Sequence, residues 1–141
     1  EYSKAGEFVY DHPFQWGSKR TGPDLHRVGG KYPNAWHYQH MYDPQSISPG
    51  SIMPRYPWLI SEDYDISDIS SKIRVMKTMN VPYPENYEQN AKADVKTQAM
   101  EISDELKSQN ITVSPDKKII ALISYLQRLG VDIKESDKAV K

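Results

Sequence analysis

Apolar residues recur at three- and four-residue steps along the second half of the chain, a spacing that places them on one face of an α-helix. The first stripe predicts a helix over residues 65–79, ended by Asn80 and the prolines that follow it. The second predicts a helix over residues 84–109 whose other faces are charged and solvated. The stripes consist of Ile66, Ile69, Ile73 and Met76, and of Tyr87, Ala91, Val95, Ile102 and Leu106.

A third helix is predicted over residues 114–129, where the sequence also carries terminal signals. Ser114 is expected as the N-cap, Pro115 as the first helical residue and Gly130 as the residue that closes the far end. The expected buried face consists of Ile119, Ile123 and Leu126. Residues 131–141 are short and polar, which predicts a frayed tail.

The first 57 residues have a different pattern. They hold six of the seven glycines and seven of the ten prolines, which excludes long regular helices. The one helix predicted there covers residues 33–41, where Pro33 suits a first turn and Trp36 and His40 lie one turn apart. Strand alternation and internal repeats are lacking. The predicted class is therefore mainly α, with a loop-rich N-terminal half followed by three helices.

Composition narrows the function classes. Lys and Arg number 18 and Asp and Glu 19 in 141 residues, a balance that disfavours dedicated nucleic-acid binding. The longest aliphatic run, residues 119–123, is far shorter than the roughly 20 residues that span a bilayer, so we expect a soluble chain. The lack of cysteine excludes disulfides, thiolate metal sites and covalent haem attachment within the chain. Because Glu1 opens the chain without a leader pattern, we interpret it as a processed or excised piece.

Two groups of polar residues are weak candidates for ligand sites. The histidines are His12, His26, His37 and His40. They lack an HExxH pattern and a carboxylate cluster, so we interpret them as surface or hydrogen-bonded side chains and disfavour a zinc hydrolase. Residues 17–31 carry four basic side chains among glycines and resemble an anion cradle, without P-loop or dinucleotide spacing. An arginine there would suit a carboxylate-bearing ligand.

Met53 is the most informative single residue. It lies in the proline-stiffened segment Ser-Ile-Met-Pro-Arg-Tyr-Pro, residues 51–57, which has neither helical nor strand periodicity. A lone methionine usually fills a core. Its thioether is also a soft ligand suited to haem iron, and the prolines restrict the backbone that would hold it. Both interpretations stay open on the residues alone.

Three segments in order resemble the distal part of a class I cytochrome c: Thr21-Gly22-Pro23-Asp24-Leu25, then Met53-Pro54, then IIALISYLQRLG ending at Gly130. Longer stretches are more specific. The segments EFVYDHPFQWGSKRTGPDLHRVGGKY, AWHYQHMYDPQSISPGSIMPRYPWL and KIRVMKTMNVPY resemble the monohaem cytochrome c subunit, of the FixO or CcoO type, of cbb-type cytochrome c oxidases. The resemblance covers roughly residues 6–130, and over 85–112 it is one of helical character more than of residues.

The resemblance implies roles for individual positions. Met53 corresponds to the distal axial ligand of the haem iron, and Pro23 to the proline whose carbonyl orients the proximal histidine. Leu25 and Leu126 correspond to apolar walls of the haem crevice. Tyr125 corresponds to the aromatic residue that packs against an N-terminal helix.

Further implications concern charge and the cofactor. Arg27, Lys31 and Trp36 are expected near the haem propionates. Subunits of this type carry, upstream of the matched part, a membrane anchor helix and a CxxCH segment that supplies both thioethers and the proximal histidine. The resemblance therefore implies haem c in the intact parent protein, and we expect none on this cysteine-free chain.

The resemblance also implies a domain organisation. Residues 1–130 are expected to form a truncated cytochrome c-like domain, followed by a polar tail at 131–141. Within it, 1–60 is the loop-rich haem-crevice region, 61–113 a helical insertion and 114–130 the C-terminal helix. Without an N-terminal helix and haem we expect an apolar patch, with self-association as one outcome. Its residues would be Leu25, Met53, Ile119, Ile123, Tyr125 and Leu126.

The expected function is electron transfer through a c-type haem toward the oxygen-reducing subunit of a haem-copper terminal oxidase. No side chain is expected to be catalytic. The expected partners are the catalytic membrane subunit and other cytochrome c subunits or donors, at the periplasmic face of the bacterial inner membrane. One alternative is a haemless interaction or assembly module, whose docking surface is the aromatic opening Phe8, Tyr10, Phe14 and Trp16. Another is a metal-dependent enzyme that uses the four histidines.

Overall fold

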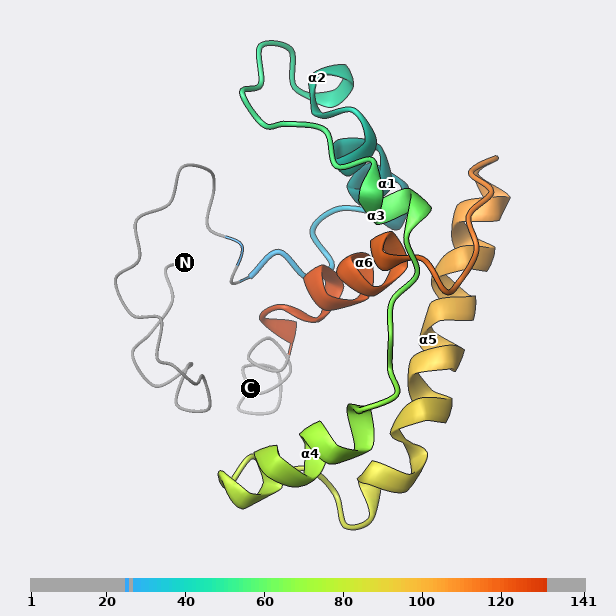
Figure 1. The fold of residues 1–141 in the computed structure, drawn as a ribbon. Helices are drawn as coiled ribbons and strands as arrows, with labels where there is room; N and C mark the ends of the chain where they lie inside the picture. The colour runs from blue at the N-terminus through green and yellow to red at the C-terminus, as the bar shows by residue number, and fades with distance from the viewer. Residues whose placement is uncertain (1–24, 26, 132–141) are drawn as a thin grey trace, which may run out of the picture.

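The computed structural model describes residue 25 and residues 27–131, which form six helices and no strand (Figure 1). The helices are α1 (Asn34–Tyr42), α2 (Pro44–Ile47), α3 (Trp58–Ser61), α4 (Ile69–Thr78), α5 (Tyr87–Ser108) and α6 (Lys118–Arg128). The mainly-α prediction is confirmed, and the three longer helices of the second half are those that the apolar stripes predicted. The short helices α2 and α3 were not predicted, because four residues give no readable period.

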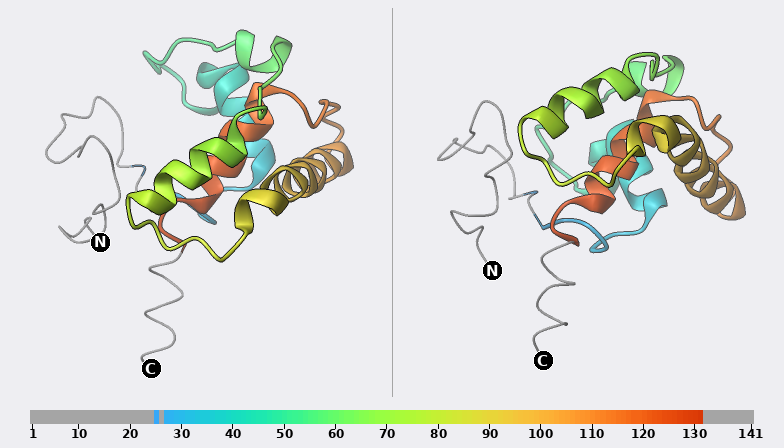
Figure 2. Two further views of the ribbon diagram at one scale, coloured as in Figure 1. Left: turned by 60° about the horizontal axis from the view of Figure 1, so that its bottom comes forward. Right: turned by 90° about the horizontal axis from the view of Figure 1, so that it is seen from below.

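Helix α6 is the centre of the fold. It lies between α1 and α3 on one side and α5 on the other, and contacts all three. Its side chains Ile119, Ile120 and Ile123 are completely buried and pack with Leu106 and Ala99 of α5. Helices α4 and α5 follow each other in the chain and pack together, and the right-hand view of Figure 2 shows α4 separate from α6. The core therefore depends on α5 and α6, and α4 packs chiefly on α5.

Two helices end on left-handed asparagines. Asn80 follows α4 with φ 63°, and Asn110 follows α5 with φ 63°. In each case the next residue donates its N–H to a carbonyl one turn inside the helix, Val81 to Met76 at 3.1 Å and Ile111 to Leu106 at 3.0 Å. These are Schellman endings, which satisfy carbonyls that a helix otherwise leaves unpaired. The prediction that α4 ends at Asn80 is confirmed.

Helices α4 and α5 both begin later than predicted. The carboxylate of Asp65 accepts the N–H of Ser67 at 2.7 Å, a local turn that competes with helix and delays α4 to Ile69. Asn86 has φ 57°, a left-handed conformation that a helix does not contain, so α5 starts at Tyr87 instead of residue 84.

The predicted start of the last helix is wrong. Ser114 is not the N-cap, because residues 114–117 form a turn in which Lys117 donates to the Ser114 carbonyl at 3.2 Å. Lys117 then pairs with Asp63 in an isolated antiparallel bridge, and the helix begins at Lys118. Gly130, with φ 75°, follows the end of the helix as predicted.

The expectation of a continuous apolar patch is only partly met. Ile119, Ile123 and Leu126 are buried by the chain itself, so they cannot belong to an exposed patch. Leu25 and Tyr125 are exposed, by 47% and 62%. Helix α5 supplies part of the cover, because Leu106 and Ala99 pack on the buried face of α6, and side chains of α1 and α3 pack against the same cluster.

Candidate functional site

The loop of residues 48–57 joins α2 to α3 and carries Met53. None of its residues is buried, Met53 is half-buried, and the neighbouring Ile52 is 87% exposed. The loop is fixed at its base, where Tyr56 donates its N–H to the Met41 carbonyl of α1 at 3.1 Å. Met53 donates its own N–H to the Ser51 hydroxyl at 3.2 Å. The thioether is thus carried by a loop attached to the last turn of α1.

An ion pair supports the same loop. Arg55 lies 3.1 Å from the carboxylate of Asp43, the residue between α1 and α2. The Gln45 amide of α2 donates to the Ser51 carbonyl at 3.3 Å. The ion pair is largely exposed, so it contributes little to stability and mainly fixes direction.

A second loop, residues 27–33, lies at the other end of α1. Gly29 donates its N–H to the Leu129 carbonyl at 3.0 Å, and Gly30 donates to the Gln127 side chain at 2.9 Å. A Cβ on Gly29 would lie 2.7 Å from the Leu129 oxygen, so only glycine fits this approach. The loop is therefore fixed to the C-terminal end of α6, beside Leu126.

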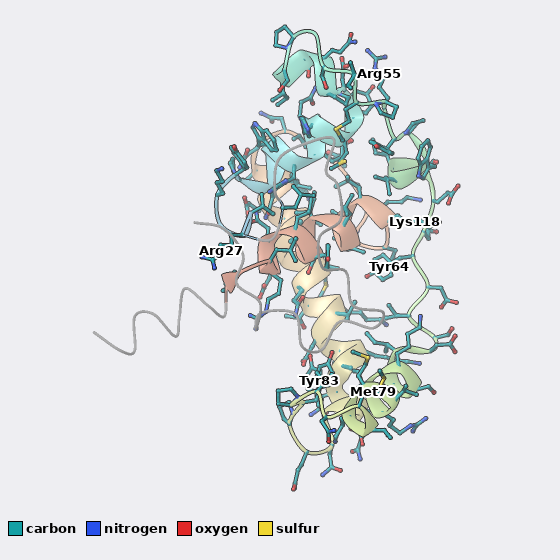
Figure 3. All side chains as sticks on the ribbon, turned by 90° about the vertical axis from the view of Figure 1, so that its left-hand side faces the viewer. Arg27, Arg55, Tyr64, Met79, Tyr83 and Lys118 are labelled. Atoms are coloured by element: carbon teal, nitrogen blue, oxygen red, sulfur yellow. The ribbon has the colours of Figure 1, made fainter. Side chains whose placement is uncertain are left out.

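The predicted site residues fall into two groups. Leu25, Arg27 and Leu126 belong to the end where the 27–33 loop meets α6, whereas Met53 belongs to the other end of α1. Figure 3 shows Arg27 beside the C-terminal end of α6 and Arg55 beyond the far end of α1. Nine residues of helix separate the ends by roughly 13 Å.

Two further predicted positions, Pro23 and Tyr125, belong to neither of these groups. Pro23 lies outside the described residues. Tyr125 faces a different region, an open groove of about 1360 Å³ lined by α4, α5, α6 and the loop between α4 and α5. Ile69, Val95 and Tyr83 also line this groove, so it is largely apolar.

Helix α1 carries a column of aromatic rings. Tyr32 and Trp36 stack with centroids 4.1 Å apart, and Trp36 and His40 stack at 4.6 Å. Lys31 places its ammonium 5.4 Å from the centre of the Tyr32 ring, within the range of a cation–π contact. Trp36, which was expected near the haem propionates, therefore belongs to an aromatic face that has the positive charge of Lys31 at one end.

His37 meets this column edge-on and is itself almost completely buried, with 2% exposure. Its Nε2 and the Nδ1 of His40 are buried without a hydrogen-bond partner among the described residues. Burial lowers the pKa of His37, and the His40 imidazole lowers it further. Burial also lowers the pKa of His40. Both rings are therefore neutral at neutral pH.

For His37 the prediction of a surface or hydrogen-bonded side chain is wrong. Asn34, His37 and Met41 recur on one face of α1, a spacing that could have indicated burial. Metal ligation gains no support, since the described part of the chain holds no group of three or more His, Cys, Asp or Glu residues that could bind a metal. His12 and His26 lie outside that part.

A polar network missed in the sequence joins α1 to α5 and α6. The Asn34 amide donates to the Glu105 carboxylate at 2.6 Å and accepts from Gln127 at 2.8 Å. Gln127 also donates to the Tyr32 carbonyl at 2.8 Å. The two residues that each of these hydrogen bonds joins lie 71 to 95 residues apart in sequence, so no local pattern could reveal the network. The network fixes the aromatic face of α1 relative to α6.

A family model described as cytochrome c oxidase, mono-heme subunit/FixO, matches residues 1–133. The chain belongs to this family. Membership of the FixO family assigns the chain to a subunit of a cytochrome c oxidase that acts in electron transfer. It also implies that the parent protein carries haem and has a catalytic subunit as its partner. No curated protein matches the chain. Within the described residues, no helix has the length and apolar character needed to span a membrane.

The residues around α1 fit a haem group. Haem needs an axial ligand, apolar walls and partners for its two carboxylates. Met53 offers a half-buried thioether, and Leu25 offers an exposed apolar side chain, whereas Leu126 is already buried by the chain. The unpartnered buried nitrogens of His37 and His40 offer hydrogen-bonding groups that the described chain itself does not use.

Proposed function

We propose that this chain is the electron-transfer domain of a cbb-type cytochrome c oxidase and that the thioether of Met53 would ligate the iron of its c-type haem. The match to the mono-heme subunit family over residues 1–133 is the observation that carries the proposal. The haem supplies the one-electron redox couple when bound. The chain's own residues position one ligand, exclude water and set the local charge.

In this proposal each part of the site has a separate task. The prolines on either side of Arg55 and the hydrogen bond from Tyr56 to Met41 hold the Met53 thioether near α1. Leu25 and Leu126 exclude water, and Pro23 orients the proximal histidine. Arg27 supplies positive charge for a propionate. Because the chain lacks cysteine, the cysteines that attach the haem covalently would lie outside these 141 residues.

The proposal extends to the setting of the subunit. It receives electrons from a cytochrome c donor at the periplasmic face of the bacterial inner membrane and passes them to the oxygen-reducing membrane subunit. Residues 1–60 form the haem-crevice region, 61–113 a helical insertion, 114–130 the C-terminal helix and 131–141 a polar tail. The helical insertion, which contains α4 and α5, leaves the groove beside Tyr125 open to a partner.

Replacing the proposed ligand tests the proposal. In the full subunit purified with its haem, Met53→Ala should abolish the long-wavelength sulfur-to-iron absorption band and lower the reduction potential, because thioether ligation favours reduced iron. Met79→Ala is the matched control, since Met79 lies at the opposite end of the molecule from Arg55 (Figure 3). An unchanged spectrum in Met53→Ala would remove Met53 from the site.

The alternative is a haemless interaction or assembly module. One observation favours it: Ile119, Ile123 and Leu126 are buried by the chain's own side chains. A full-length subunit that is purified from the assembled oxidase with no haem, and that still binds the catalytic subunit, would establish this alternative.

A further inference from the structure

Two histidine nitrogens of α1, which are buried without a hydrogen-bond partner among the described residues, destabilise the fold. A buried polar atom without a partner costs about 1–3 kcal/mol, and most such atoms in proteins are paired. His37 Nε2 and His40 Nδ1 lie three residues apart on one helix, and neither has a partner among the described residues. The rings themselves are fixed, because Trp36 contacts both of them. A missing hydrogen-bonding group is therefore indicated at this face.

The surroundings favour a negatively charged partner. The Lys31 ammonium lies over Tyr32, whose ring contacts both Trp36 and His37. The acid that reaches α1 from α5, Glu105, accepts from the Asn34 amide. A neutral imidazole can donate one N–H, and a carboxylate is the acceptor that forms the strongest such bond.

We infer that His37 and His40 donate hydrogen bonds, through Nε2–H and Nδ1–H, to a propionate carboxylate of the haem. The inference rests on the proposed function, and it adds two positioning residues that the family match does not assign. It identifies the Trp36–His40 face of α1 as the side of the crevice that holds the propionate end. His40 lies in the last turn of α1, beside Met41, whose carbonyl anchors the Met53 loop. Lys31 flanks the same aromatic column at the first-turn end of the helix.

The test uses the haem-loaded full subunit and the propionate-bending band in its resonance Raman spectrum. His37→Leu should shift this band and lower the reduction potential, because the propionate then keeps more negative charge beside the iron. His37→Gln should restore both values, since its amide places an N–H donor near the position of Nε2. His40→Leu and His40→Asn form the corresponding pair for Nδ1.

Gln39→Leu is the matched control on the same helix. Its amide donates to the Ser46 hydroxyl at 3.1 Å, so the variant loses a hydrogen bond of α1 without touching the histidine pair. The control should leave the Raman band and the potential unchanged. An equal shift in Gln39→Leu would show that any perturbation of α1 produces the effect, and would overturn the inference.

A wild-type measurement keeps the inference testable if the leucine variants do not fold. Exchange of the wild-type subunit into D2O should shift the propionate band, because N–D replaces N–H at the carboxylate. A band that is unchanged in D2O overturns the inference, because no exchangeable N–H then reaches the carboxylate. Loss of haem or of Met53 ligation in the wild type would instead contradict the proposed function.

Discussion

Two segments of similar length, Lys118–Arg128 and residues 48–57, are held in different ways. The helix buries Ile119, Ile120 and Ile123 completely, whereas the loop buries no residue and is fixed by a few polar contacts with α1 and α2. Apolar burial contributes about 25 cal/mol per Å², so the stability of the described chain comes mainly from α5 and α6. The proposed ligand lies in the loop.

This difference suggests a division of tasks. The core forms from contacts that the chain makes by itself, and we expect it to form with or without a cofactor. The loop presents a weak ligand and has few contacts to fix it, so we expect its position to depend on the group that it binds. Changes to the core should alter stability, and changes to the loop should alter the redox site.

The largest expected effect is in the core. Ile123→Ala should lower the free energy of unfolding by about 2–5 kcal/mol, because it leaves a cavity in fully buried surroundings. Met100→Ala is the control, since Met100 is 52% exposed on α5 and its replacement should cost less than about 0.5 kcal/mol. Urea denaturation measures both values. Similar losses in the two variants would contradict the assignment of the core to α5 and α6.

The next effect concerns the junction between the 27–33 loop and α6. Gly29→Ala should cost up to about 3 kcal/mol, because the new Cβ would press on the backbone carbonyls of Gln127 and Leu129. Gly30→Ala meets no atom within 4 Å and should cost only about 1 kcal/mol, from its φ of 68°. Thermal or urea unfolding of the two variants compares them. A larger loss in Gly30→Ala would show that the loop does not approach α6 closely.

A smaller effect should appear with pH. The pKa values of His37 and His40 are lowered from 6.5 in the fold, so the unfolded chain binds more protons once the pH falls below that value. Stability should therefore decrease between pH about 7.5 and about 5.5. Urea denaturation at the two pH values should show a smaller decrease in His37→Gln than in the wild type. An equal decrease would mean that His37 is accessible to protons in the fold.

The helical half was largely predictable because its signals are local. The stripe of Ile69, Ile73 and Met76 predicted α4, and the helix ends before the left-handed Asn80, as expected. The start of α6 was not predictable. Ser114 and Pro115 form a standard local start signal, but the bridge between Asp63 and Lys117 uses the backbone there, and its partner lies 54 residues away.

The candidate site was predictable only in its single residues. Met53 could be singled out from its prolines, and its role still rests on the family resemblance. The burial of His37 and the pairing of Asn34 with Glu105 depend on contacts between α1, α5 and α6, which the sequence does not show. The burial of a polar side chain such as His37 is difficult to predict when no group in the chain hydrogen-bonds to it, because the sequence then holds no partner that could indicate it.

The most direct test of the central claim is an NMR spectrum of the reduced full subunit with its haem, labelled with ¹³C at the methionine methyl groups. The chain contains Met41, Met53, Met76, Met79 and Met100. A methyl group next to the iron lies over the porphyrin ring, and the ring current should move its signal far upfield. One such signal is expected, and it should disappear in Met53→Ala. A spectrum with only ordinary methionine signals, or an upfield signal that persists in Met53→Ala, would contradict the central claim.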